Sequence, residues 1–177
     1  IPSSNWHNDF YFDYGVHRGC YCRGVPGMAR HAHRHHLGNR HQLKGEVMKP
    51  SEITPEMVQF LRERHLATLT TLRKDGSPHV VAVGFSYDVE QQRARVITFS
   101  TSQKSKNALL GGRAAVSQVD GGRWLTLEGV AHLVTRETDP DEVQRAVAGY
   151  AARYQEPKER DNRVAVIIEV DRIMGRA

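Results

Sequence analysis

The segment Ser100–Asn107 carries side chains well suited to binding an anion. It reads Ser-Thr-Ser-Gln-Lys-Ser-Lys-Asn and directly follows the β-prone run Ala94–Phe99. A helix that begins here would offer free backbone N–H groups and a partial positive charge, and added lysines favour a phosphate ligand. The same residues also suit a capped surface helix whose lysines are solvated. The segment alone leaves both interpretations open.

The surrounding sequence predicts a mostly β, α+β domain that would hold this segment. The run Thr54-Pro55-Glu56 predicts a helix start, and another helix is predicted over Pro140–Tyr154. The pair Asp75-Gly76 is a hairpin signal. Strand patterns occur over six runs: Leu66–Leu72, Pro78–Tyr87, Ala94–Phe99, Ala114–Val119, Trp124–Thr135 and Val164–Val170. Their short connections favour an antiparallel sheet, which at this size commonly closes into a small barrel.

One of these predicted strands is apolar on both faces. Its series Val80, Val81, Ala82 and Val83 leaves no polar side. In an antiparallel sheet, one face often meets water. Either the barrel buries this strand twice, or a partner subunit covers one side of it.

Residues 1–47 differ in composition from the rest of the chain. They hold seven of the ten histidines, both cysteines and a net charge of +3, without sustained apolar periodicity. Such a composition predicts disorder. Cys20 and Cys22 are separated by one residue rather than the usual two to four or so, and the histidines form no regular array. We therefore do not expect a metal site in this segment.

The folded domain is expected to begin at Met48. Codons for Lys44-Gly45-Glu46 can spell a purine-rich run that resembles a bacterial ribosome-binding site ahead of a start codon. We therefore expect residues 1–47 to be a translated leader outside the native protein. Residues 48–177 are expected to form the working domain.

The bulk properties of the chain disfavour two classes of partner. Residues 48–177 carry a net charge of only +2, which gives no support to nucleic-acid binding. No apolar run approaches the roughly 18 residues of a membrane span. No signal-peptide pattern opens the chain, so we expect a cytoplasmic protein.

Four parts of the sequence together resemble one known family. The run His65–Phe85 resembles the first hairpin of the split β-barrel flavin- and deazaflavin-dependent oxidoreductases, which are the pyridoxamine-phosphate-oxidase-like proteins. Ser102–Asn107, Ser117–Gly129 and Arg163–Val170 agree with that family in order and spacing. Within this family, the sequences of these segments are most similar to those of the coenzyme F420-dependent group B enzymes, and specifically to the biliverdin reductases among them.

This resemblance implies a six-stranded antiparallel split β-barrel with flanking helices, assembled as a homodimer with cofactor sites at the subunit interface. It implies an F420H2-dependent reductase that transfers a hydride to a conjugated substrate, biliverdin to bilirubin above all. The deazaflavin would lie across the strand that begins at Pro78, with its phosphate on Lys104. Some relatives place an arginine two residues before that lysine, where this chain has Ser102.

The implied site draws on three stretches of the chain. Its cofactor-binding candidates are His79, Val80, Val81, Ala82, Ser100, Thr101, Ser102, Gln103, Lys104, Asn107, Gly121, Gly122, Arg123 and Trp124. Its substrate-binding candidates are Lys106, Arg123 and Trp124.

Residue chemistry agrees with these roles and leaves simpler ones open. Small and β-branched side chains let a flat ring approach the backbone, but they also suit an ordinary strand core. Trp124 could wall a substrate pocket or fill the mouth of the barrel. His79 is expected to pack or hydrogen-bond rather than to act as a catalytic acid. No catalytic side chain is assigned, because the cofactor carries the difficult step. No metal motif is recognised in residues 48–177.

Two further functions share the same fold. One is an FMN-dependent oxidoreductase of the pyridoxamine-phosphate-oxidase type. The other is a non-enzymatic split barrel that carries a flavin or haem.

Overall fold

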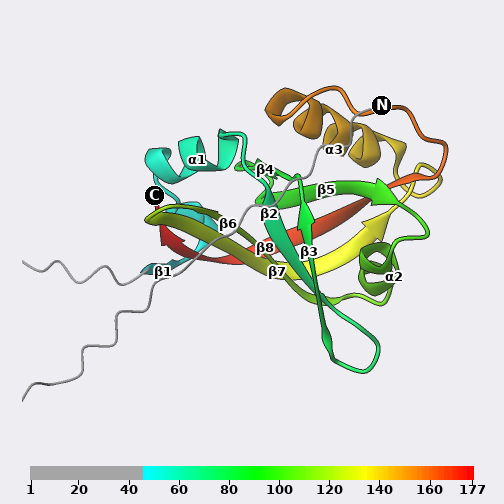
Figure 1. Ribbon diagram of the computed structural model, residues 1–177, viewed down its shortest axis with the longest axis horizontal. Helices are drawn as coiled ribbons and strands as arrows, with labels where there is room; N and C mark the ends of the chain where they lie inside the picture. The colour runs from blue at the N-terminus through cyan, green and yellow to red at the C-terminus, as the bar shows by residue number, and fades with distance from the viewer. Residues whose placement is uncertain (1–45) are drawn as a thin grey trace, which may run out of the picture. The chain divides into compact units, whose positions relative to one another are not determined.

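The computed structural model describes residues 46–177, which form a β-sheet flanked by three α-helices and a short 3₁₀ helix (Figure 1). The helices are η1 (Pro50–Glu52), α1 (Pro55–Arg62), α2 (Gln103–Leu109) and α3 (Pro140–Arg153). The strands are β1 (Glu46–Met48), β2 (Ala67–Leu72), β3 (Pro78–Val83), β4 (Ser86–Asp88), β5 (Arg93–Phe99), β6 (Gly112–Asp120), β7 (Arg123–Val134) and β8 (Arg163–Arg176).

All eight strands belong to one antiparallel sheet. Hydrogen-bonded neighbours follow the order β3-β2-β6-β7-β8-β5-β4, and β1 pairs with the later part of β8. The predicted hairpin at Asp75-Gly76 joins β2 to β3. There Asp75 Oδ1 accepts from the Ser77 backbone N–H at 3.0 Å, and Gly76 has a positive φ of 80°. The mostly β fold class predicted from the sequence is therefore confirmed.

The two edge strands of this sheet are consecutive in the chain. β3 pairs with β2 at one edge, β4 pairs with β5 at the other, and only Gly84 and Phe85 join them. The sheet therefore curls back on itself without β3 pairing to β4. Phe85 gives its backbone bonds to α3: its N–H donates to Tyr154 Oη (3.3 Å), and its carbonyl accepts from Arg153 (2.7 Å).

This link corrects the single strand predicted over Pro78–Tyr87. The chain leaves one edge at Gly84 and joins the other at Ser86, so the predicted strand is two strands. A Cβ at position 84 would lie 2.7 Å from Tyr150 Cε2, so glycine lets α3 pack against the link. Together with the addition of β1, this change raises the predicted six strands to eight.

Strand β8 runs through the middle of the sheet, and both of its faces are covered. Val166 and Ile168 lie in the main core, which also contains Phe60 and other apolar side chains of the sheet. Ala165 and Ile167 belong to a second cluster with residues of α3. This double burial explains why the sequence of the strand shows an unbroken apolar run.

The structure confirms the predicted helices, with α1 beginning after a Thr54 cap that accepts from Met57 N at 3.3 Å. The predicted domain boundary between Val47 and Met48 falls inside β1, which pairs Val47 with Met174. The expected disorder is therefore wrong for Glu46 and Val47, because backbone pairing with β8 orders them. The predictions for residues 1–45, including those on Cys20 and Cys22, lie outside the described residues. No helix in residues 46–177 is long and apolar enough to cross a membrane.

One face of β2 and β3 is open in the single chain. Val80 is 59% exposed and Leu72 is 43% exposed. The pairing places Val80 beside Thr70 and Ala82 beside Thr68, and neither strand contains Asp, Glu, Lys or Arg. The barrel thus does not bury β3 on both sides, which was one of the two predicted alternatives.

Candidate functional site

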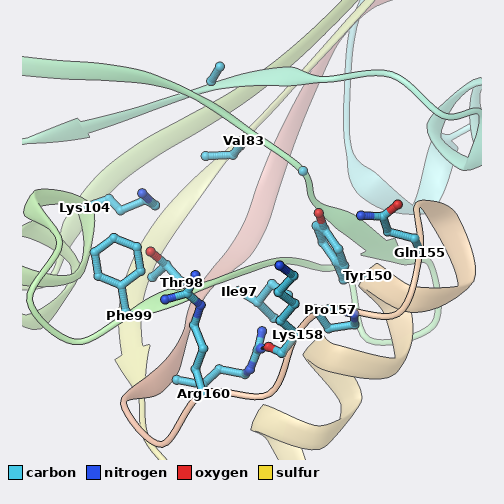
Figure 2. Close-up of a pocket in the computed structure, with 13 residues that line it drawn as sticks. Val83, Ile97, Thr98, Phe99, Lys104, Tyr150, Gln155, Pro157, Lys158 and Arg160 are labelled. Carbon is cyan, nitrogen blue, oxygen red and sulfur yellow. Dashed lines mark hydrogen bonds between the residues drawn. The ribbon is translucent and has the colours of Figure 1, made fainter. Parts of the chain in front are cut away.

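A cavity of about 410 Å³ lies where the sheet is split. The Gly84 link and the end of β3 form one side, the end of β5 forms another, and α2, α3 and the loop after α3 complete it (Figure 2). The lining consists of Ala82, Val83, Gly84, Ile97, Thr98, Phe99, Lys104, Tyr150, Gln155, Pro157, Lys158, Arg160 and Arg163. Ala82 and Lys104, which are far apart in sequence, thus line the same cavity.

Lys104 reaches this cavity from the first turn of α2. Its ammonium lies 5.8 Å from the centroid of the Phe99 ring, in the range of a cation–π contact. Burial lowers the pKa of Lys104 from the ordinary lysine value of 10.5. A bound anion would offset that cost, so Lys104 is suited to hold one.

Ser102 positions Lys104 without lining the cavity itself. As the N-cap of α2, its Oγ accepts from the Ser105 backbone N–H at 3.3 Å. The same hydroxyl lies 2.8 Å from Ser105 Oγ and 3.2 Å from Thr98 Oγ1. These contacts are buried and tie α2 to the end of β5. The structure therefore supports a capping role for Ser102.

Asn107 is likewise engaged inside the protein. Its Nδ2 donates to Thr71 Oγ1 at 2.9 Å, and its Oδ1 accepts from Gln103 Nε2 at 2.7 Å. The side chain is buried and fixes α2 against β2. Ser100 and Thr101 are exposed and stand outside the lining.

Three further cations enter the cavity from the loop after α3 and from the start of β8. Figure 2 shows Lys158 and Arg160 reaching in from this loop, while Lys104 reaches in from α2. Arg163 is buried, and its guanidinium donates to the Lys158 carbonyl. The lining contains no Asp or Glu. The cavity therefore combines four cations with aromatic and small apolar side chains.

Tyr150 and Phe99 supply flat surfaces within this lining. Tyr150 stacks on Tyr154, with ring centroids 4.9 Å apart and 30° between the planes. The Tyr154 hydroxyl donates to the His65 carbonyl at 2.6 Å, which holds this pair of rings in place. Aromatic and small side chains near cations suit a planar, anionic ligand.

His79 lies on β3 near Lys104 but is not part of the cavity lining. Its Nδ1 atom is buried and has no hydrogen-bond partner among the described residues. Burial lowers the pKa of His79, and the charges of Arg73 and Lys104 lower it further. The imidazole is thus kept neutral near pH 7, with one polar atom left for a ligand.

The turn Gly121–Trp124 lies at the far end of β6 from α2. The nine residues of β6 separate the two, which at about 3.3 Å per residue is on the order of 30 Å. Gly121 adopts a positive φ of 57° in this hairpin turn. A single chain therefore does not bring this predicted part of the site to Lys104.

Arg123 in this turn is already held by two acids. Its guanidinium donates to both carboxylate oxygens of Glu63 (3.0 and 2.9 Å) and to Asp120 (2.5 Å), and it lies 4.6 Å from the centre of the Phe60 ring. The bond to Arg123 lowers the pKa of the Glu63 carboxyl. Glu63, His65 and Asp120 also group closely enough to suggest a cation site, but the guanidinium accounts for both carboxylates. This cluster gives no support to Arg123 as a ligand for acids.

Sequence comparison decides the family. A model described as pyridoxamine 5'-phosphate oxidase matches residues 53–176, which is well over half of the chain. The chain belongs to the pyridoxamine 5'-phosphate oxidase family. The family match and the open, curled sheet agree with the split barrel expected from the sequence.

Individual proteins are also similar to this chain. The F420H2-dependent biliverdin reductase of Mycobacterium tuberculosis (strain CDC 1551 / Oshkosh) is 48% identical over 131 residues, covering 74% of this chain and 93% of that protein. A conserved hypothetical protein from Mycobacterium tuberculosis has a solved structure with a TM-score of 0.58 and 25% identity, covering 70% of this chain and 85% of that one. A structure named F420 reductase matches with a TM-score of 0.51 and 22% identity, over 65% of this chain and 93% of that one.

Several residues that line this cavity were not predicted from the sequence. Tyr150, Lys158 and Arg160 line the cavity but are absent from the candidates that the sequence offered. The basic cluster Lys158, Arg160 and Arg163 is interspersed with Glu159 and Asp161, so the local sequence does not mark it as a site. The cluster became informative only when β5 and β8 placed it opposite Lys104. Lys106, predicted to bind substrate, is exposed and outside the lining.

Proposed function

We propose that this protein is an F420H2-dependent reductase of a conjugated substrate, and that it reduces biliverdin to bilirubin. The observation that carries the proposal is the cationic cavity, free of acids, in a chain 48% identical to an F420H2-dependent biliverdin reductase. F420 carries a phosphate and glutamates, and biliverdin carries two propionates. Both ligands therefore match the charge of the lining.

The cofactor fits the described residues at two points. Lys104, desolvated and without an acidic partner, is the group that would hold the phosphate. Ala82, Val83 and Gly84 are small enough for a flat ring to approach the backbone of the split. When bound, reduced F420 supplies the hydride.

The side chains of the cavity then orient the two flat molecules and exclude water. Phe99 and Tyr150 provide the aromatic walls, and Tyr150 is kept in place by its stack on Tyr154. Fixed walls of this kind favour the reaction because they hold the reacting atoms in one geometry. The lining contains no carboxyl or imidazole group, so we expect solvent to provide the proton that accompanies the hydride.

The working protein is proposed to be a homodimer in the cytoplasm. The open face of β2 and β3 supports this, because it exposes Val80, Leu72 and Ala82 without a charged side chain. A shallow groove of about 210 Å³ continues this face over β6, where Thr70, Leu72 and Ala115 line it together with Arg113 and Glu128. A second copy on this face would also be the means by which Gly121, Gly122 and Trp124 reach a cofactor.

Absorption spectroscopy and turnover test the function. The purified protein is mixed with F420H2 and biliverdin, and we expect oxidation of F420H2 to accompany formation of bilirubin. Tight binding of FMN with no response to F420 would instead identify the flavin-dependent alternative. A Soret band with no turnover would identify a haem carrier. Size-exclusion chromatography with light scattering tests the dimer.

A further inference from the structure

We propose that the loop between α3 and β8 forms a second anion subsite in which Lys158 and Arg160 bind carboxylates. Lys104 would hold a phosphate on the opposite side of the same cavity. The inference rests on the proposed function for the identity of the ligand. It goes further by assigning two residues to carboxylate recognition and by requiring a ligand with several anionic groups.

The charge balance of the cavity is the first support. Lys158 and Arg160 form no ion pair with another described residue, and their neighbours in the lining include Lys104 and Arg163. Burial lowers the pKa of Arg163, and the charges of Arg136 and Arg160 lower it further, while Glu156 and Glu159 oppose this shift. Glu156 and Glu159 lie in the same loop but are exposed and outside the lining. A surplus of positive charge in a cavity attracts anions.

The position of the loop is fixed by the fold, which is the second support. The last pair of β5 and β8 joins Phe99 to Arg163, immediately before the segment that leads to α2. The Ser100 backbone N–H donates to the Asn162 carbonyl at 3.0 Å. Buried Arg163 donates to the Lys158 carbonyl and so fastens the middle of the loop. The two cationic sides of the cavity are thus anchored to the same strand pair before any ligand binds.

This arrangement selects the class of ligand. A single phosphate would be satisfied by Lys104 and would leave the loop cations without a partner. A ligand with a phosphate and separate carboxylates, or a planar ligand with two carboxylates, uses both sides. The tail of F420 and the propionates of biliverdin are two sources of the same chemistry, and the experiment distinguishes them.

The test compares the double variant Lys158→Ala/Arg160→Ala with the control double variant Arg62→Ala/Lys74→Ala. All four side chains are exposed, and the control pair lies outside the cavity. Affinity is measured for F420 and for a deazaflavin without its phosphate–glutamate tail. KM is measured for biliverdin and for its dimethyl ester, which lacks the two charges.

We expect the loop variant to lose roughly tenfold in affinity for one charged ligand, with its uncharged counterpart and the control variant unaffected. A rise in the Kd of F420 alone assigns the subsite to the cofactor tail. A rise in the KM of biliverdin alone assigns it to the substrate. If neither value changes, or if the uncharged ligands weaken equally, the subsite is refuted.

A separate measurement covers failure of the proposed function. If the natural protein binds neither F420 nor biliverdin, a triglutamate peptide is titrated while the amide signals of the loop are followed by NMR. Binding that the loop variant loses and the control variant keeps would preserve the subsite while the proposed function falls. Absence of peptide binding would then overturn the subsite as well.

Discussion

Lys104 and Arg123 were both predicted to bind the cofactor, but the two cationic regions that contain them differ in their neighbours. At the split of the barrel, Lys104, Lys158 and Arg160 converge on a cavity with no acid in its lining. At the β6–β7 turn, Arg123 is held by Glu63 and Asp120. Both regions contain basic side chains, but only those of the first region are free of acidic partners among the described residues and so available to a ligand.

The difference shows that a basic side chain is available to bind a ligand only if it is not already paired with carboxylates of the protein. A guanidinium that already meets two carboxylates would have to give up those bonds to bind a ligand. A desolvated ammonium beside other cations is stabilised when an anion arrives. The cations of the first region should therefore control affinity, whereas Arg123 in the second should influence only the fold.

The largest expected effect comes from Arg153, which connects the two regions. Its buried guanidinium donates to the carbonyls of Glu63 (2.9 Å) and Phe85 (2.7 Å) and to the Gln118 side chain. Arg153→Ala leaves these acceptors without their donor, and we expect the free energy of unfolding to fall by about 3 kcal/mol. Denaturant titration at fixed protein concentration measures this loss. Exposed Arg62→Ala serves as the control, and an equal loss in both variants would contradict the connecting role.

The next effect separates two lysines of one helix. Lys104→Ala should weaken F420 binding by roughly 1–3 kcal/mol, because a charge-assisted contact to phosphate is lost. Lys106→Ala should leave the affinity unchanged, since this side chain is exposed and outside the cavity. Fluorescence titration measures both variants. Equal losses would show that α2 acts through bulk charge, and the contrast between the two regions would then weaken.

The third effect concerns the β6–β7 turn, where Arg123 is already paired with acids. Arg123→Ala should change the affinity for F420 by less than about twofold, because Arg123 is already engaged by Glu63 and Asp120. The melting temperature of the Arg123→Ala variant should be slightly lower than that of the unchanged protein, and this difference should be smaller at high salt. A loss of affinity as large as that of Lys104→Ala would show that Arg123 binds ligand, and the comparison would be broken.

The smallest effect is a pH dependence of the first region. Burial lowers the pKa of Lys104 from 10.5, so its ammonium loses the proton at a lower pH than an exposed lysine does. F420 affinity should therefore decline as the pH rises through the lowered value, before reaching 10.5. In the ligand-free protein, the same shift makes the free energy of unfolding increase with pH between the folded-state and unfolded-state pKa values of Lys104, because the unfolded chain binds more protons there. Lys104→Arg, which stays charged, should remove the decline in affinity, and an unchanged decline would assign it to another group.

Much of the fold was predictable because it depends on local patterns. The Thr54 cap, the Asp75-Gly76 turn and the apolar alternation of the strands each act over a few residues. The break at Gly84 was not predictable in this way. Nothing in its neighbourhood shows that Tyr150, Tyr154 and Arg153 of a distant helix take over the space and the backbone bonds there.

The candidate site was predictable only where local sequence and function coincide. Lys104 follows a strand and a capping serine, which is a local signal for an anion site. Ser102 and Asn107 share that signal, yet their side chains face inward and hold the helix in place. Lys158 and Arg160 gave no local signal, because their role depends on a strand pairing between β5 and β8.

The sequence by itself determined most of the secondary structure, the family resemblance and the choice of Lys104, since these follow from side-chain types and their spacing. Only the tertiary structure decided which charges remain available. A long-range contact brought Glu63 to Arg123, beside its local partner Asp120, and the cavity at the split of the barrel was left with cations and no acid. The physical reason is that the energy of a charge depends on its neighbours in space, and a neighbour such as Glu63 is distant in sequence.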